Sequence, residues 1–253
     1  MKKLEGKVVI ITGGGKGIGK GVAKAFADEG ANLVITGRTL SRLEDAKNEI
    51  EKEYGVKVLP VVAEGANEEE VKNVVDQAIK TYGKIDVLVN NAQASKSGVM
   101  LVDHSKEDFD LAINSGLYGT FFYMKYCFPY LKETQGSVIN FASGSGLSGK
   151  PGQSSYAASK EGIRGMSRVA ATEWGPYNIN VNVVCPLVMT EELEKWKAAY
   201  PEIYAKTIQG IPLQRFGDAQ KDIGRICVFL ASEDASYISG ETFSAQGGGG
   251  LRP

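Results

Sequence analysis

A tyrosine and a lysine four residues apart hold the strongest potential for chemistry in this sequence. Tyr156 and Lys160 belong to the segment Tyr-Ala-Ala-Ser-Lys, which begins a predicted helix. Four-residue spacing places the phenol and the ammonium on one helix face, about one turn apart. A phenol acts as acid and base near neutrality only if its pKa falls from about 10 to about 7, and an ammonium at about 4 Å supplies stabilisation of that order. The pair predicts metal-free acid–base chemistry, although an ordinary exposed helix has the same spacing.

Two further polar sites lie where predicted strands end. Ser143 closes the apolar run that begins at Val138, and its hydroxyl has the chemistry to polarise a carbonyl oxygen. The segment Asn90-Asn91-Ala92 ends another predicted strand. Ligands of doubly wound sheets bind at the carboxyl ends of the strands. We therefore expect these groups at the ligand-binding edge of one sheet.

A glycine-rich turn separates the first predicted strand from the first predicted helix. Glycines let the backbone approach a pyrophosphate, whose charge is stabilised by free N–H groups at a helix N-terminus. The alternative, a nucleoside triphosphate loop, needs a hydroxyl after Gly-Lys, but Gly19-Lys20 is followed by Gly21. The turn therefore predicts a dinucleotide, bound by Gly13, Gly15, Lys16, Gly17, Ile18 and Gly19.

The end of the second predicted strand indicates which dinucleotide is bound. A protein that binds NAD places an Asp or Glu there to accept from the ribose 2′-hydroxyl, but the next carboxylate after the strand is Glu44. Arg38 stands at the strand exit instead, and Lys16 lies inside the glycine-rich turn. A 2′-phosphate pairs with such cations. The sequence predicts NADP(H) as the cofactor.

These groups need a scaffold, and the hydrophobic pattern predicts an α/β one. Apolar runs of strand length alternate with segments of helical period. Alternation of this kind demands right-handed crossovers and a parallel sheet covered on both faces. We expect one doubly wound Rossmann-type domain over residues 1–253, with seven parallel strands near residues 8–11, 33–35, 58–62, 85–89, 138–141, 181–184 and 242–245.

Composition excludes several classes of function. The chain has 253 residues, with 29 Lys+Arg against 30 Asp+Glu, so it lacks the basic excess of a nucleic-acid-binding protein. No apolar run reaches the ~18 residues of a membrane span, and charges at Lys2, Lys3 and Glu5 come too early for a signal peptide. We expect a cytoplasmic protein that binds neither nucleic acid nor membrane.

The residue counts give little support to a metal site or to a Ser-His-Asp catalytic triad. His104 is the single histidine, which nearly excludes a zinc site, and its surroundings are typical of a solvated turn. Cys127, Cys185 and Cys227 are widely spaced among apolar residues and are expected to be buried thiols.

The motifs, in this order, resemble those of the short-chain dehydrogenase/reductase family over almost the whole chain. The matches are TGxxxGxG at residues 12–19, Asn-Asn-Ala at 90–92, Asn114, Ser143, and YxxxK at 156–160. The resemblance implies that Tyr156 is the general acid/base, that Ser143 orients the substrate oxygen, and that Lys160 binds the nicotinamide ribose. It also implies that Asn114 anchors a water in a proton relay, while hydride passes between a carbinol carbon and nicotinamide C4.

The chain departs from the family pattern at several cofactor-binding positions. Gln93 follows Asn-Asn-Ala where the family usually has glycine, and Glu64 stands in place of the usual aspartate after the third strand. Asn90 and Ala92 are expected cofactor contacts by resemblance. After the sixth strand the usual Pro-Gly is Pro186-Leu187. The threonine that follows this pair, Thr190, is closer to it than is usual in the family. We expect contacts with the nicotinamide carboxamide near Met189 and Thr190, within this altered segment.

Unusual segments resemble a subgroup, the bacterial NADP-dependent 12α-hydroxysteroid dehydrogenases that act on bile acids. They lie at residues 90–95, 115–118, 130–136, 185–187 and 250–253. An apolar stretch within residues 187–213 is suited to a lid over a hydrophobic alcohol or ketone, or equally to core packing. The alternatives are a reductase of 3-oxoacyl thioesters or xenobiotic ketones, and a silent nucleotide sensor, which the intact catalytic set disfavours.

The stretch from Phe109 to Leu131 predicts self-association. Nearly every face of this expected helix carries an apolar or aromatic side chain, so covering one sheet face leaves apolar surface in water. A subunit interface buries that surface, although the sheet and a loop are an alternative cover. The family resemblance suggests a tetramer built on the helices that carry Asn114 and Tyr156.

Overall fold

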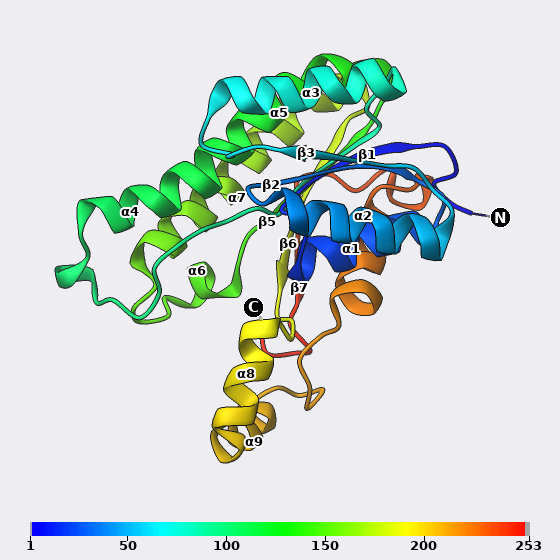
Figure 1. Ribbon diagram of the computed structural model, residues 1–253. Coiled ribbons are helices and arrows are strands. Elements are labelled where there is room, and N and C mark those ends of the chain that lie inside the picture. The colour runs from blue at the N-terminus through cyan, green and yellow to red at the C-terminus, as the bar shows by residue number, and fades with distance from the viewer. Residues whose placement is uncertain (1, 251–253) are drawn as a thin grey trace.

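The seven expected strands form one parallel sheet in a computed structural model that describes residues 2–250 (Figure 1). Their order across the sheet is β3-β2-β1-β4-β5-β6-β7. The order reverses between β1 and β4, which is the place where doubly wound sheets bind ligands. The α/β prediction is confirmed, with strands β1 (Val8–Thr12), β2 (Asn32–Gly37), β3 (Val58–Val62), β4 (Val87–Asn90), β5 (Ser137–Phe141), β6 (Asn180–Pro186) and β7 (Thr242–Ala245).

Helices flank the sheet on both sides. The α-helices are α1 (Gly17–Asp28), α2 (Leu40–Tyr54), α3 (Glu68–Tyr82), α4 (Lys106–Ala112), α5 (Gly119–Thr134), α6 (Gly144–Ser148), α7 (Ser154–Trp174), α8 (Glu191–Ala199), α9 (Pro201–Gln209) and α10 (Arg225–Leu230). Shorter turns are the 3₁₀ helices η1 (Leu101–Asp103), η3 (Gly175–Tyr177) and η5 (Glu233–Ala235), and the π-helices η2 (Ile113–Tyr118) and η4 (Ala219–Gly224). Leu251, Arg252 and Pro253, which belong to one of the subgroup segments, lie outside the described residues.

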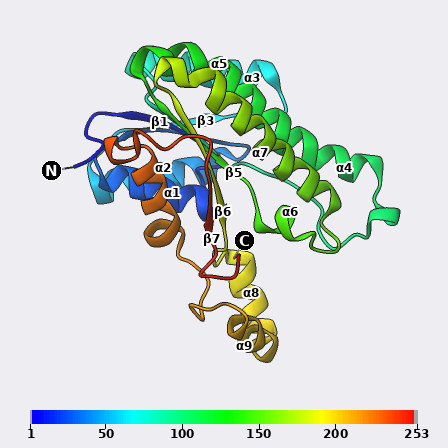
Figure 2. The ribbon, with the colours of Figure 1, turned by 180° about the vertical axis from the view of Figure 1, so that it is seen from behind.

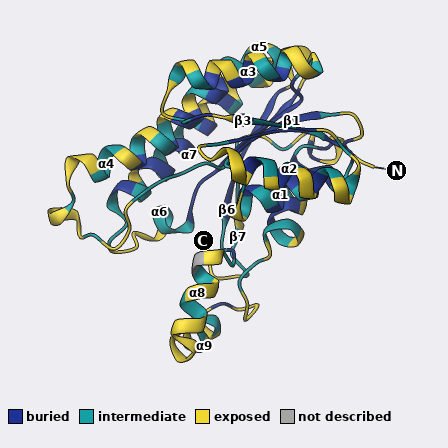
Figure 3. Ribbon diagram, viewed as in Figure 1, coloured by how far each residue is buried: buried dark blue, intermediate teal, exposed yellow. Residues whose placement is uncertain are grey.

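The strands are apolar throughout because both sheet faces are covered. Val9 and Ile11 of β1 pack into a core with α1, α2 and α10, while Ile10 between them packs into a second core with α3, α5 and α7. Figures 1 and 2 show these two helical layers on opposite sides of the sheet. The buried strands appear as a dark blue centre in Figure 3. Such two-sided cover is what a parallel sheet requires.

Helix ends follow the expected capping chemistry. The Asn67 side chain accepts hydrogen bonds from the backbone N–H groups of Glu69 and Glu70, and so caps α3. At the other end of α3, Gly83 adopts a left-handed conformation with φ 77°. Gly55 ends α2 in the same way, with φ 71°.

The apolar stretch expected as one helix is divided in the structure. The π-helix η2 separates α4 from α5, because one helical turn there is wider than an α-turn. Tyr123 and Leu131 of α5 are buried in the core, whereas Tyr118 and Phe121 are exposed. Apolar surface thus remains uncovered on this side of the chain.

Helices α8 and α9 extend beyond the carboxyl edge of the sheet, where the lid was expected (Figures 1 and 2). Their rings make an aromatic cluster in which Tyr204 contacts both Trp196 and Phe216, at centroid distances of 6.2 and 6.1 Å. Tyr200 and Ile203 are exposed. Within residues 2–250, no helix is both long and apolar enough to cross a membrane.

Candidate active site

Tyr156, Lys160 and Ser143 come together at the carboxyl edge of the sheet. Ser143 follows β5 and is nearly buried, and its hydroxyl is hydrogen-bonded to the Tyr156 phenol. The Lys160 ammonium, which is 2% exposed, donates to the backbone carbonyl of Phe141 over 2.8 Å. This bond fixes α7 against the end of β5. The Lys160 Nζ atom lies 5.6 Å from the centroid of the Tyr156 ring.

Burial dominates the electrostatics of this pair. Burial lowers the pKa of the Lys160 ammonium to about 8, because the charged form loses its hydration. Burial also raises the pKa of the Tyr156 phenol, and the hydrogen bond from Ser143 acts in the opposite direction. The sequence predicts that the ammonium lowers the pKa of the phenol, whereas burial is the largest influence in the structure.

Within the described part of the chain, Asn114 makes no hydrogen bond to these three side chains. It belongs to η2 and is exposed. Its neighbour Ser115 binds the loop after β4 instead: the Ser115 hydroxyl accepts from Ala94 N at 3.0 Å and lies 2.9 Å from Ala94 O. The structure therefore gathers Ser143, Tyr156 and Lys160, and the Asn114 segment η2 packs directly against α7 and binds the loop after β4 through Ser115.

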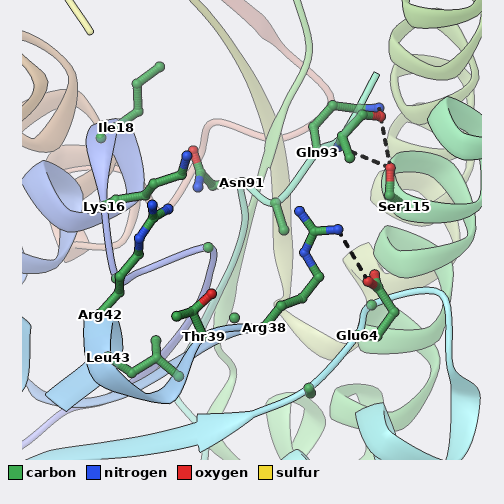
Figure 4. A pocket seen from close by; sticks show the side chains of 18 of the residues that line it. Lys16, Ile18, Arg38, Thr39, Arg42, Leu43, Glu64, Asn91, Gln93 and Ser115 are labelled. Carbon is green, nitrogen blue, oxygen red and sulfur yellow. Dashed lines mark hydrogen bonds and ion pairs between the residues drawn. The ribbon is translucent and has the colours of Figure 1, made fainter. Parts of the chain in front are cut away.

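A pocket of about 340 Å³ lies over the glycine-rich turn (Figure 4). Its size falls within the range of about 300–1,000 Å³ that small-molecule sites occupy. The predicted cofactor-binding residues that line it are Gly13, Gly15, Lys16, Gly17, Ile18, Arg38, Glu64, Ala92 and Thr190. Gly19, Asn90, Met189, Tyr156 and Lys160 lie outside this lining.

The glycine-rich turn fits a pyrophosphate. Gly13 has φ 68°, and a Cβ atom there would lie 2.8 Å from the Asn91 side-chain nitrogen. A Cβ at Gly19 would lie 2.2 Å from the Gly13 carbonyl oxygen, so this glycine allows α1 to pack on the turn. The N-cap residue Lys16 provides no side-chain cap for α1. The first backbone N–H groups of α1 are thus suited to bind a phosphate.

Asn91 is a pocket residue that the sequence reasoning missed. Thr12 Oγ1 accepts from the backbone N–H groups of Asn91 and Ala92, both at 2.9 Å, and Asn91 Nδ2 donates to Thr12 O at 2.9 Å. The Asn90 side chain instead donates to Asn140 Oδ1 in the interior, at 2.8 Å. Successive side chains along a strand point to opposite faces of the sheet, so Asn90 and Asn91 point in opposite directions. This alternation could have identified Asn91 from the sequence.

Cations surround the other end of the pocket. Arg38 Nη1 lies 3.6 Å from Glu64 Oε2, and both side chains are substantially exposed. Arg42, also missed from the sequence, lines the same pocket, and Figure 4 shows it there with Lys16 and Arg38. Its position four residues after Arg38, at the start of an expected helix, could have identified it. The backbone N–H of Glu64 is already bonded to Glu70 Oε2, at 2.7 Å.

Thr190 stands between this pocket and the helices beyond it. Its hydroxyl caps α8 by accepting from Leu193 N at 3.2 Å. Thr190 lines the main pocket and, with Met189, a second hollow bounded by Tyr204 and Phe216. The Met189 N–H donates to Gly217 O at 3.0 Å. The segment after β6 thus connects the cofactor end of the site to the aromatic cluster of α8 and α9.

Comparison with known proteins agrees with this geometry. The sequence profile of a family described as enoyl-(acyl carrier protein) reductase matches residues 13–249. A 12α-hydroxysteroid dehydrogenase of a Clostridium species is 61% identical, with 99% of each chain covered. The 3-oxoacyl-(acyl-carrier-protein) reductase of Thermotoga maritima is 39% identical, covering 97% of this chain and 98% of that one.

Solved structures give the same result. Levodione reductase superimposes with a TM-score of 0.91 at 32% identity, covering 97% of this chain and 98% of the other. A putative short-chain alcohol dehydrogenase from Sinorhizobium meliloti has a TM-score of 0.88 at 31% identity, covering 98% of this chain and 97% of the other. The chain belongs to the short-chain dehydrogenase/reductase family. As a member of it, the protein is an oxidoreductase that acts on CH–OH donors with a nicotinamide cofactor.

Burial of the Lys160 ammonium destabilises the folded protein. Its pKa is about 8 in the folded protein and 10.5 as the reference value, a difference that corresponds to roughly 3 kcal/mol below pH 8. Loss of the bond to Phe141 O offsets part of this, at about 1–3 kcal/mol. We expect Lys160→Met to raise the free energy of unfolding at pH 7 by roughly 1 kcal/mol and to abolish turnover.

The pH dependence of the free energy of unfolding is expected to show that the buried Lys160 charge destabilises the folded protein. The unfolded chain holds the Lys160 proton more tightly, so wild-type stability should rise as the pH goes from about 8 towards 10, and Lys160→Met should lack this rise. Urea unfolding at several pH values measures both effects. Lys72→Met, at an exposed position of α3, is the control. A Lys160→Met protein less stable than wild type at pH 7 would contradict the assigned cost of burial.

Proposed function

We propose that this protein is an NADP(H)-dependent dehydrogenase of the 12α-hydroxyl group of bile acids. The observation that carries the proposal is the 61% identity to a 12α-hydroxysteroid dehydrogenase over 99% of both chains. The matched region includes the site and the segment after β6, where family members that act on different substrates would be expected to differ. Ancestry and site chemistry thus support the same reaction.

Three groups of this chain perform the proposed chemistry at the substrate oxygen. The Ser143 hydroxyl, which donates to the Tyr156 phenol in this structure, turns its one proton to the substrate oxygen and so holds that oxygen beside the phenol. Tyr156 takes the hydroxyl proton during oxidation and returns it during reduction. Lys160, fixed by Phe141 O, binds the ribose and stabilises the phenolate. The cofactor, when bound, supplies nicotinamide C4 as the hydride acceptor or donor.

The cation cluster at the pocket supports NADP(H) over NAD(H). Arg38, Arg42 and Lys16 line the pocket where β2 ends, and Glu64 is the carboxylate there. The ion pair of Arg38 with Glu64 is long and exposed, so it is worth about 1 kcal/mol at most and yields readily to a phosphate. A 2′-phosphate forms stronger charge-assisted bonds with a guanidinium.

The helices after β6 supply the proposed substrate cover within residues 187–213. The rings of Trp196, Tyr204 and Phe216 form a cluster, and Tyr204 and Phe216 border a hollow with Met189 and Thr190, whose rim also carries charged side chains. A sterol body needs apolar rings of this kind to pack against. Lys197 is engaged with its own helix neighbours, at 3.8 Å from Glu194 and 4.9 Å from the Tyr204 ring centroid. Lys195 is exposed. It is therefore a better candidate than Lys197 to bind the carboxylate tail of a bile acid.

A reductase of 3-oxoacyl thioesters is the second candidate. It rests on the 39% identity to the Thermotoga maritima enzyme over nearly the full chain. The same serine, tyrosine and lysine serve either substrate, so the substrate pocket has to distinguish them. The lower identity makes this the weaker proposal.

A panel of bile acids tests the proposed substrate. Cholate and deoxycholate carry a 12α-hydroxyl, and chenodeoxycholate lacks it. We expect NADP reduction, followed by nicotinamide absorbance, with the first two only, and a loss of at least about a hundredfold in Tyr156→Phe. Equal oxidation of all three, or good reduction of an acetoacetyl thioester with no bile-acid turnover, would overturn the 12α assignment.

Cofactor choice is tested at the cation cluster. Arg38→Asp combined with Lys16→Ala should raise the Michaelis constant for NADP at least about tenfold, because each lost charge-assisted bond is worth about 1.5–3 kcal/mol. The constant for NAD should change little or fall. Lys72→Asp, a charge reversal on exposed α3, is the control. An unchanged constant for NADP in the double variant would refute the assignment.

We also propose a cytoplasmic homotetramer. Tyr118 and Phe121 are exposed beside Leu111 on α4, η2 and α5, and Val169 is exposed on α7. These are the helices expected to form the interface, and apolar surface of this kind is normally buried by a partner. The three cysteines are buried and form no disulfide with one another, which suits a reducing compartment.

Light scattering at micromolar concentration measures the assembly. We expect about four times the mass of one chain, and a smaller species for Phe121→Glu, because a buried unpaired carboxylate is costly. Val62→Glu, at an exposed apolar position of β3, should keep the wild-type mass. A wild-type monomer would refute the tetramer.

A further inference from the structure

Glu64 is the carboxylate that faces the cations where β2 ends. Its Oε2 atom lies 3.6 Å from Arg38 Nη1, an approach that Figure 4 marks with a dashed line. The sheet register brings the two residues together: Gly37 at the end of β2 pairs with Val62 at the end of β3, so Arg38 and Glu64 follow at one corner of the pocket. The usual aspartate at position 64 is one methylene shorter, so it would reach less far towards Arg38.

The backbone at Glu64 is anchored to the start of α3, whereas its carboxylate is only loosely held. Glu64 N donates to Glu70 Oε2 at 2.7 Å, and Glu64 O accepts from Asn67 N at 2.9 Å. Among the residues that the structure describes, the Glu64 carboxylate forms an ion pair only with Arg38, and Arg38 only with Glu64. Their side chains are 40% and 65% exposed, so this ion pair is weak and exchanges readily for a stronger one.

Two other cations border the same pocket. Lys16 and Arg42 line it together with Arg38, and Figure 4 shows Arg38 between these two residues and Glu64. In this view the ion pair engages the Arg38 guanidinium on the side away from Lys16 and Arg42. A phosphate forms strong, often bidentate bonds with a guanidinium. A phosphate held among these cations would therefore need the guanidinium that Glu64 binds.

We propose that Glu64 is a specificity-determining residue that competes with the 2′-phosphate of NADP(H) for Arg38. When the phosphate binds, the guanidinium leaves Glu64, and the lost ion pair weakens the binding of a dinucleotide that carries the phosphate. A dinucleotide without the phosphate leaves the pair intact and has no such cost. The carboxylate is exposed, so its direct repulsion of the phosphate is screened, and competition for Arg38 is the main effect.

The competition limits the affinity for NADP(H) and shortens the time for which the reduced cofactor stays bound. Differences in affinity between related complexes appear mostly in the dissociation rate. Glu64 thus favours release of the cofactor after each turnover, at the expense of discrimination against NAD(H). The inference rests on the proposed use of NADP(H), but on no particular substrate.

Glu64→Gln is the primary test, because it removes the charge and keeps the size of the side chain. We expect the dissociation constant for NADPH, measured by nicotinamide fluorescence, to fall at least about threefold, which matches the strength of an exposed ion pair. The dissociation rate of NADPH, measured by stopped-flow fluorescence, should fall by a similar factor. The dissociation constant for NADH should stay within about 1.5-fold, because NADH has no 2′-phosphate.

Two further variants separate reach from charge. Glu64→Asp keeps the charge but shortens the side chain, so its constant for NADPH should lie between those of the wild type and Glu64→Gln. Glu69→Gln is the matched control, since Glu69 is an exposed glutamate in the first turn of α3 and does not line the pocket. It should leave the constants for NADPH and NADH within about 1.5-fold of the wild type.

A double-mutant cycle tests whether Glu64 acts through Arg38. Arg38→Met removes the guanidinium, so the phosphate and Glu64 have nothing left to compete for. Adding Glu64→Gln to Arg38→Met should then change the constant for NADPH by less than about 1.5-fold. A gain as large as in the wild-type background would mean that Glu64 repels the phosphate directly, and would overturn the proposed competition.

The remaining outcomes are also decisive. Weaker or unchanged NADPH binding in Glu64→Gln would overturn the proposal, and weaker binding would show that the ion pair holds Arg38 in place for the phosphate. An equal gain with NADH would overturn it as a general effect of charge. If the wild type binds NADPH and NADH alike, the NADP(H) assignment fails. A preference for NADPH gained in Glu64→Gln would still support the competition in that case, and no such gain would overturn it.

Discussion

A buried ammonium next to the end of a central strand is the constraint on which this site depends. Lys160 is 2% exposed, and a charge so placed persists only with fixed partners around it. The carbonyl of Phe141 is one such partner, and it ties the middle of α7 to the last residue of β5. Once that bond is made, Tyr156 and Ser143 have little freedom, because each is attached to one of the two joined elements. The bond between Lys160 and Phe141, which the burial of the charge requires, thus positions the Tyr156 phenol relative to Ser143.

The sheet order makes this alignment useful. Because β4 lies between β1 and β5, the loops that follow these three strands meet at one edge. Thr12 at the end of β1 holds the backbone of Asn91 and Ala92 at the end of β4. The phosphate-binding turn and the acid–base helix therefore border the same short loop, which begins at residue 91. A cofactor that reaches from one to the other has to pass over it.

Much of this arrangement could be predicted from the sequence, because it follows from local patterns. Strand positions came from apolar runs that both sheet faces require, and α2 and α3 end at residue types that commonly cap helices, such as Asn67 and Gly83. The glycine-rich turn and the tyrosine–lysine pair were found because their spacing is fixed by local geometry. The strand β4 begins two residues later than expected, since buried Ile85 precedes the strand without joining its ladder, and β2 and β6 end two residues later than expected.

Tertiary contacts decided what the sequence could not. The apolar run at residues 109–131 was expected as one helix, and its division at η2 was not predicted; Ala112 O, at the start of that turn, accepts from Gln93, which is distant in the chain. The pKa of the Tyr156 phenol follows burial more than its spacing from Lys160, and burial is a property of the whole fold. Arg42 and Asn91 were missed for a smaller reason: Arg42 lies one helical turn after Arg38, and Asn91 is the middle residue of a motif whose first and last residues had been assigned.

The same contacts show why the loop after β4 tolerates a large side chain where a small one is usual. Consecutive residues of this loop have divided tasks: Asn91 and Ala92 bind Thr12, and Gln93 binds Ser159 and the end of α4. A small residue at 93 would leave the space beside Gly116 open to water and the Ser159 hydroxyl without this acceptor. The amide closes that space and joins the cofactor side of the site to α7 through hydrogen bonds. The loop thereby links the end of β1 to the helix that holds Tyr156 and Lys160.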